Sequence, residues 1–122
     1  MKTVLVVDDS RIMRNIVKNT FKLLRIPCQF LEAEDGNKAF QLLEMNKVSL
    51  VLLDWNMPKL DGMGFLEKVR SMPDYKDLPI VMVTSESAKY NVVEALQAGA
   101  TDYIIKPLKD KIFMEKLNDL NF

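Results

Sequence analysis

Short runs of consecutive aliphatic residues recur along the chain. They cover residues 3–7, 50–53, 80–83 and, less regularly, 102–106. Runs without alternating polar positions are typical of strands buried on both faces, as in a parallel sheet that helices cover. The segment 29–32 is less apolar, so we expect an edge strand there.

Apolar residues recur at helical spacing between these strands. The first helix follows Ser10, a good N-cap residue, and ends before Pro27. Its apolar positions are Ile12, Met13, Ile16, Val17, Phe21 and Leu24. Four further helices are expected around 39–43, 65–72, 88–98 and 112–120. Five strands alternating with five helices predict an α/β fold, a doubly wound five-stranded parallel sheet with right-handed crossovers.

The composition excludes several classes of function. Lys plus Arg equals Asp plus Glu at 17 each, so no net charge draws the chain to nucleic acid or membrane. The absence of histidine excludes Ser-His-Asp and Cys-His catalysis and argues against zinc. The single cysteine, Cys28, rules out an internal disulfide and fits a reducing, cytoplasmic location. We also expect no signal peptide and no membrane span.

Polar residues stand at the ends of four predicted strands. Asp8 and Asp9 follow the first, Asp54 follows the third, Thr84 the fourth, and Lys106 ends the fifth. Because the carboxyl ends of parallel strands lie along one edge, folding should bring these side chains together. Two like charges about 4 Å apart cost roughly 4 kcal/mol at an effective dielectric near 20. Either one carboxyl is then protonated or a cation neutralises the cluster, and oxygen ligands suit Mg²⁺.

This expected cluster indicates phosphoryl chemistry. We predict that Asp54 is a nucleophile that takes up a phosphoryl group, while Lys106 and Thr84 stabilise the group in transfer. Taken singly, Asp54 could begin a turn, Lys106 could be a surface lysine and Thr84 a strand former. Taken together, their convergence is hard to attribute to chance.

Along essentially its whole length the chain resembles the receiver domain of two-component response regulators. The matching motifs are Asp8-Asp9-Ser10, Asp54-Trp55-Asn56-Met57-Pro58 with Asp61-Gly62, Thr84-Ser85-Glu86, Ala98-Gly99-Ala100 and Lys106-Pro107. Within that family it is most similar to the CheY type of chemotaxis regulator. The resemblance implies a flavodoxin-like sheet with strand order 2-1-3-4-5. It also implies one receiver domain over residues 1–122, without an output domain.

The resemblance further implies a metal-dependent phosphoacceptor. Asp54 would accept phosphate from a sensor histidine kinase. Mg²⁺ would be bound by Asp8 (through water), Asp9, Asp54 and the backbone carbonyl of Asn56. Asn56 and Glu86 would modulate dephosphorylation, with a phosphatase as a further candidate partner.

A switch to an output surface is implied as well. Thr84, Ser85 and Lys106 would contact the phosphoryl group, and the bond from Lys106 to Pro107 would be cis. Thr84 would move towards the phosphate, and Tyr103 would turn inward in response.

The output surface would lie on the last two helices and the last strand. We expect Lys89, Val92 and Tyr103 to form an exposed surface there that takes a downstream protein, possibly the flagellar motor switch. The protein is expected to be a monomer that signals by binding and is not an enzyme in the ordinary sense.

Two other functions stay open at this point. A small phosphohydrolase can also use a strand-end aspartate, but such enzymes usually carry a second acid two residues later. Here that position is Asn56, which cannot transfer protons. Alternatively, the chain is a receiver excised from a larger DNA-binding regulator.

Overall fold

The computed structural model describes residues 1–55, 62–85 and 89–122, with only the backbone of residues 89–91. The strands are β1 (Lys2–Val7), β2 (Cys28–Ala33), β3 (Leu50–Asp54), β4 (Ile80–Thr84) and β5 (Asp102–Ile105). The helices are α1 (Arg11–Leu23), α2 (Gly36–Met45), α3 (Gly62–Arg70), α4 (Lys89–Gln97) and α5 (Asp110–Asp119), with a short 3-10 turn, η1 (Pro73–Tyr75). The predicted alternation of strands and helices is confirmed. Within the described ranges no helix is long and apolar enough to cross a membrane.

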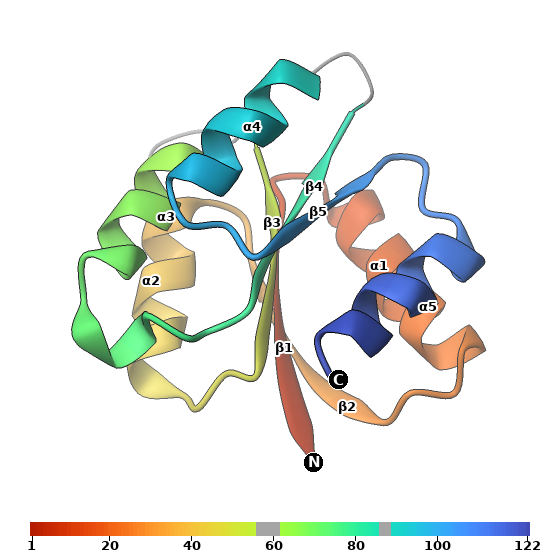
Figure 1. The fold of residues 1–122 in the computed structure, drawn as a ribbon. Coiled ribbons are helices and arrows are strands. Elements are labelled where there is room, and N and C mark those ends of the chain that lie inside the picture. Colours follow the sequence, from red (N-terminus) through yellow and green to blue (C-terminus); the bar gives the residue numbers. More distant parts are fainter. Residues whose placement is uncertain (56–61, 86–88) are drawn as a thin grey trace.

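All strand pairs of the sheet are parallel, and the strand order is β2-β1-β3-β4-β5. This order is the one implied by the receiver resemblance, and β2 is an edge strand as expected. Helices α1 and α5 cover one face of the sheet, and α2, α3 and α4 cover the other (Figure 1). The central strand, β3, is therefore shielded on both faces, which explains why its sequence is a continuous aliphatic run.

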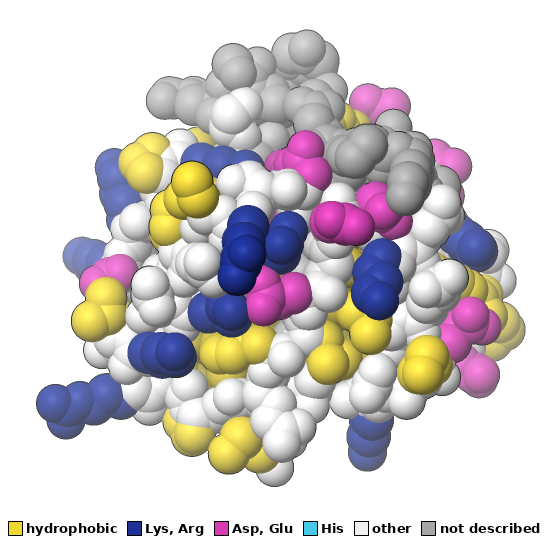
Figure 2. Space-filling model, turned by 180° about the vertical axis from the view of Figure 1, so that it is seen from behind, with side chains coloured by type: hydrophobic (Ala, Val, Ile, Leu, Met, Phe, Trp, Pro, Cys, Tyr) yellow, Lys and Arg dark blue, Asp and Glu magenta, His cyan; other side chains and the backbone are white. Residues whose placement is uncertain are grey.

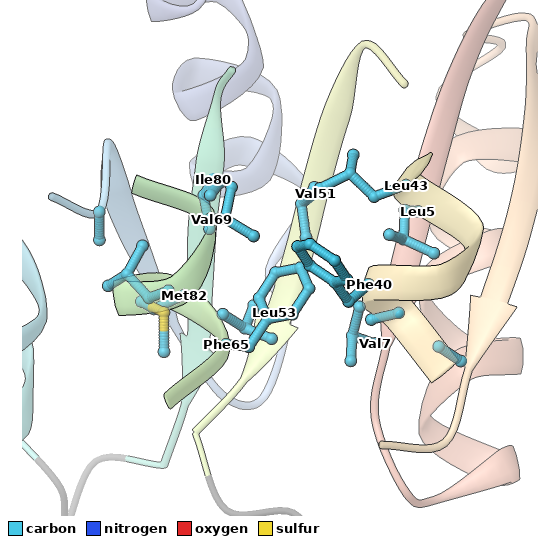
Figure 3. Packing of buried hydrophobic residues seen from close by; sticks show 14 of the residues in the cluster. Leu5, Val7, Phe40, Leu43, Val51, Leu53, Phe65, Val69, Ile80 and Met82 are labelled. Atoms are coloured by element: carbon cyan, nitrogen blue, oxygen red, sulfur yellow. The ribbon is translucent and has the colours of Figure 1, made fainter. Parts of the chain in front are cut away.

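Two apolar cores lie on the two faces of the sheet because successive residues of a strand point to opposite sides. On the face of α2 and α3, Phe40 and Phe65 share a cluster with Leu53 of β3 (Figure 3). On the face of α1 and α5, Phe21 and Phe113 share a cluster with other residues of β1, β3 and β4. Both cores hold the carboxyl-terminal ends of β1 and β3 in place.

Helix α1 turns a narrower face to the sheet than the sequence predicted. Its buried residues are Val17, Thr20 and Phe21, whereas Ile12 is 74% and Ile16 is 44% exposed. At about 100° per residue, Ile12 lies roughly 140° around the helix from Val17. Spacing alone identified apolar positions but not which of them face the sheet.

The aromatic cluster under α1 makes the first prediction. Phe21 is fully buried and packs edge-to-face against the rings of Phe30, Phe113 and Phe122, with ring centroids 5.1 to 6.0 Å apart. We expect Phe21→Ala to lower the free energy of unfolding by about 3–5 kcal/mol in urea titrations. Leu23→Ala is the matched control on the same helix, because Leu23 is 75% exposed, and should change it by no more than about 0.5 kcal/mol. Equal losses in the two variants would contradict this account of the core.

Candidate functional site

Three carboxylates meet at the carboxyl-terminal edge of the sheet. Asp54 is the last residue of β3, and Asp8 and Asp9 follow β1 directly. Asp8 and Asp54 are buried and Asp9 is exposed, and one carboxylate oxygen from each lies within 4.8 Å of the others. The sequence predicted this convergence from strand ends alone. β1 and β3 are neighbouring parallel strands in which Val7 pairs with Leu53. Asp8 and Asp54, the residues that follow this pair, therefore lie side by side.

Lys106 supplies a positive charge to this cluster. Its Nζ lies 3.4 Å from Asp54 Oδ1, to which it donates a hydrogen bond, and 3.6 Å from Asp8 Oδ2. The Lys106 backbone N–H donates to the carbonyl of Thr84 at 2.7 Å, which ties the end of β5 to the end of β4. The bond between Lys106 and Pro107 is cis, the isomer that the resemblance implied.

The backbone holds Asp8 firmly at this edge. Its N–H donates to the carbonyl of Ala33 in β2 at 3.0 Å. Its carboxylate accepts the N–H of Ser10 at 2.9 Å, and the Ser10 hydroxyl in turn accepts the N–H of Met13 as the N-cap of α1. The turn that carries the two acids is thus part of the helix start.

A glycine keeps the segment after β3 close to the site. The N–H of Gly62 donates to the carbonyl of Trp55 at 3.1 Å. A Cβ at position 62 would lie 2.7 Å from the carbonyl oxygen of Asp54, nearer than real Cβ atoms approach backbone. Only glycine allows α3 to begin this close to the end of β3.

The cluster carries more negative charge than Lys106 compensates. Burial, and next the charge of Asp8, raises the pKa of Asp54 to about 6 although Lys106 acts in the opposite direction. Burial also raises the pKa of Asp8 above its ordinary value, against the hydrogen bond from Ser10 and the charge of Lys106. Both shifts express the cost of keeping ionised carboxylates together out of water.

The donor set fits a hard divalent cation. Mg²⁺ prefers oxygen ligands, usually binds through one or two carboxylates and keeps several waters. Two buried carboxylates and one exposed carboxylate provide such ligands and leave one side open to solvent. Because the pKa of Asp54 is raised, a cation here would relieve an existing electrostatic cost.

Of the other predicted site residues, Thr84 and Ser85 lie at the end of β4. Thr84 is buried at the end of β4, next to the end of β3, since Asp54 pairs with Val83. Ser85 follows and is exposed. Asn56 and Glu86 lie outside the described residues, as does the side chain of Lys89.

One residue of the expected output surface is misplaced. Val92 is only 8% exposed, so the prediction that it forms part of an exposed patch is wrong. Helical spacing placed it beside Lys89, but α4 turns Val92 inward and exposes Val93 and Leu96 instead. Tyr103 is half-buried in β5, and the ammonium of Lys116 lies 4.5 Å from the centre of its ring.

A cavity of about 390 Å³ lies beside Tyr103, and the sequence analysis missed it. Its lining includes Lys106 from the site and Lys109, Ile112 and Lys116 from the region of α5. The last three are spaced by three and four residues, so a search for a mixed basic and apolar helix face would have found them.

Comparisons with known proteins agree with this geometry. The family model of the response regulator receiver domain matches residues 4–118. The sequence is 46% identical to a chemotaxis protein CheY homolog of Campylobacter jejuni, over 95% of this chain and 89% of that protein. It is also 46% identical to chemotaxis protein CheY1 of Helicobacter pylori, over 93% and 91%. The solved structure of CheY4 from Vibrio cholerae superimposes with a TM-score of 0.86 at 31% identity, covering 98% of each chain.

The raised pKa of Asp54 makes the second prediction. A folded pKa of about 6 against 3.8 unfolded favours folding of the protonated form, so stability is lost as pH rises through about 6. Asp54→Asn, which is neutral at every pH, should therefore raise the free energy of unfolding at pH 7.5 by about 1–3 kcal/mol. The gain should shrink towards zero near pH 4. Urea titrations without divalent metal at both pH values measure it, and a gain that does not depend on pH would contradict the electrostatic explanation.

Proposed function

Because this chain belongs to the response regulator receiver domain family, we propose that it is a phosphorylation-activated response regulator of the chemotaxis type, with Asp54 as phosphoacceptor. The observation that carries the proposal is the meeting of Asp8, Asp9 and Asp54 beside the ammonium of Lys106. The phosphodonor is the phosphohistidine of a sensor kinase, which agrees with a chain that has no histidine of its own.

Asp54 is suited to be the nucleophile. With a pKa of about 6 its carboxylate is mostly ionised near neutral pH, and burial leaves it poorly solvated. One carboxylate oxygen attacks phosphorus, an O–P bond forms, and the P–N bond to the donor imidazole breaks. The imidazole keeps the electron pair of that bond and takes up a proton.

The neighbouring residues then stabilise the transferred group. Lys106, now 3.4 Å from Asp54 Oδ1, pairs with a phosphoryl oxygen, and the Thr84 hydroxyl and Ser85 stand on the adjacent strand end. Asp9 and Asp54, with Asp8 acting through water and the backbone carbonyl of Asn56, would hold Mg²⁺. When bound, Mg²⁺ neutralises charge on the transferring phosphoryl oxygens. Asn56 and Glu86 modulate the rate at which the phosphoryl group is lost.

The signal leaves through the β5 face. Phosphorylation biases an existing equilibrium between two arrangements by adding charge at Asp54. Thr84 moves towards the phosphoryl group, and Tyr103, half-buried on the neighbouring strand, turns inward. A downstream protein, for which the flagellar motor switch is our candidate, then binds at Tyr103, Lys89 and the adjoining cavity.

The charge distribution supports a protein partner rather than nucleic acid. Acidic and basic side chains both lie on the face seen in Figure 2, and the sequence has 17 of each sign. We propose that the protein acts as a cytoplasmic monomer whose only chemistry is its own phosphotransfer and dephosphorylation. A phosphohydrolase is not favoured, because the curated relatives are chemotaxis proteins.

The third prediction tests the phosphoacceptor. With Mg²⁺ and acetyl phosphate, the intact mass of the protein should rise by one phosphoryl group, and chelation of the metal should prevent it. Asp54→Asn should abolish the increase, whereas Asp119→Asn, an exposed acid on α5, should retain it. Multiple turnover of the phosphodonor without labelled protein would favour the phosphohydrolase.

The fourth prediction tests the output. Tyr103→Ala should accept the phosphoryl group at the wild-type rate, because Tyr103 does not reach the acidic cluster by any recorded contact within the described residues. When both are phosphorylated, Tyr103→Ala should bind the purified flagellar motor switch protein of the same organism at least about tenfold more weakly than the wild type does. Equal affinity of the wild type and Tyr103→Ala for the motor switch protein would show that the signal leaves by another route.

A further inference from the structure

A chain of charged side chains links α1 and β2 to the turn that carries the acids. Arg14 Nη1 donates to the backbone carbonyl of Asp8 at 2.6 Å. Arg14 Nε donates to Glu32 Oε1 at 3.0 Å, and Lys18 Nζ bonds the other oxygen, Glu32 Oε2, at 2.8 Å. The side chain of Arg14 is only 14% exposed, although it is a cation on the first turn of a helix.

Arginine suits this position because its planar guanidinium presents several donors in a fixed arrangement. One donor is on a carbonyl of the β1–α1 turn and another on a carboxylate of β2. Lys18 and Arg14 lower the pKa of Glu32, as expected for a carboxylate held ionised between two cations. Glu32 in this way fixes the direction of the Arg14 side chain.

Arg14 completes the set of bonds on Asp8. The N–H of Asp8 is bonded to Ala33, its carboxylate to Ser10, and its carbonyl to Arg14. The carbonyl belongs to the peptide bond between Asp8 and Asp9, so the guanidinium fixes the plane of the peptide that joins the two acids. Rotation of that peptide would displace the carboxylate of Asp9 relative to Asp54.

We propose that Arg14 is a positioning residue for Mg²⁺ binding, which through the Asp8 carbonyl orients the carboxylates of Asp8 and Asp9 towards Asp54. The inference rests on the proposed function of the same site. Partners behind metal ligands commonly change metal affinity by 10–100-fold, and Arg14 acts on the backbone of a ligand residue in the same manner.

The sign of the effect separates positioning from simple electrostatics. Removal of a cation that is bonded to the backbone of one of the three acids should, by charge alone, leave the binding of Mg²⁺ unchanged or strengthen it. Loss of the correct turn should weaken it. Arg14→Met, which keeps the apolar stem and removes the donors, thus gives different results under the two explanations.

The experiment is a titration of the unphosphorylated protein with Mg²⁺ alone by isothermal calorimetry. We expect Arg14→Met to raise the dissociation constant about tenfold and Arg14→Lys, which keeps a charged donor but loses the planar arrangement of donors, to raise it less. Lys68→Met, which removes from α3 a cation that lies over the ring of Phe40 of α2, is the control for net charge and should bind Mg²⁺ no more weakly than wild type. Because Glu32 acts through Arg14, Glu32→Gln should have no further effect in the Arg14→Met background.

Unchanged or tighter binding of Mg²⁺ by Arg14→Met would overturn the inference, even if its melting temperature falls, because Arg14 would then be merely structural. If Arg14→Met does not fold, the single variants Arg14→Lys and Glu32→Gln take its place. Wild-type affinity for Mg²⁺ in both of them overturns the inference in the same way. Wild-type protein that neither binds Mg²⁺ nor takes up phosphate would contradict the proposed function itself. Wild-type protein that does both while Arg14→Met binds Mg²⁺ normally would contradict only the role of Arg14.

Discussion

The buried carboxylate of Asp54 beside two other acids is the constraint on which the rest of the site depends. Each acid is placed by a strand or turn that the core holds rigidly, so the three cannot separate to reduce their repulsion. Lys106 compensates part of the charge, and the pKa of Asp54 still lies near 6. At a site of this kind, a divalent cation is bound more tightly the more carboxylate repulsion it removes.

The same constraint connects the chemistry to signalling. The proposed phosphoryl group on Asp54 would replace one negative charge by a larger one in a place where the charge balance is already unfavourable. Lys106 is bonded both to Asp54 and, through its backbone, to Thr84 at the end of β4, so these hydrogen bonds connect the acid directly to the ends of β4 and β5. Tyr103 lies on β5, two strands away from Asp54. A short path of direct contacts thus leads from the acid to the surface beside α5.

Much of the fold followed from the aliphatic runs. Unbroken runs at 3–7, 50–53 and 80–83 predicted buried parallel strands, and the acids after the first two of these runs predicted the acidic edge. The strand order came only from the family resemblance, because hydrophobic pattern does not say which strands are neighbours. Helix rotation could not be predicted either. Ile12 and Val92 are both apolar at helical spacing, yet one is exposed and the other buried, since packing against the sheet decides which side of a helix is covered.

Contacts to the backbone were also beyond the sequence. The bond from Arg14 to the carbonyl of Asp8 involves an acceptor that every residue possesses, so no residue pattern marks it.

The carboxyl carbon of Asp54, followed by carbon-13 NMR over a pH titration, gives the most direct test of the central claim. The account predicts a pKa near 6 without metal and a much lower pKa in saturating Mg²⁺. A pKa close to 3.8 in both conditions would show that the acids are not held together as described.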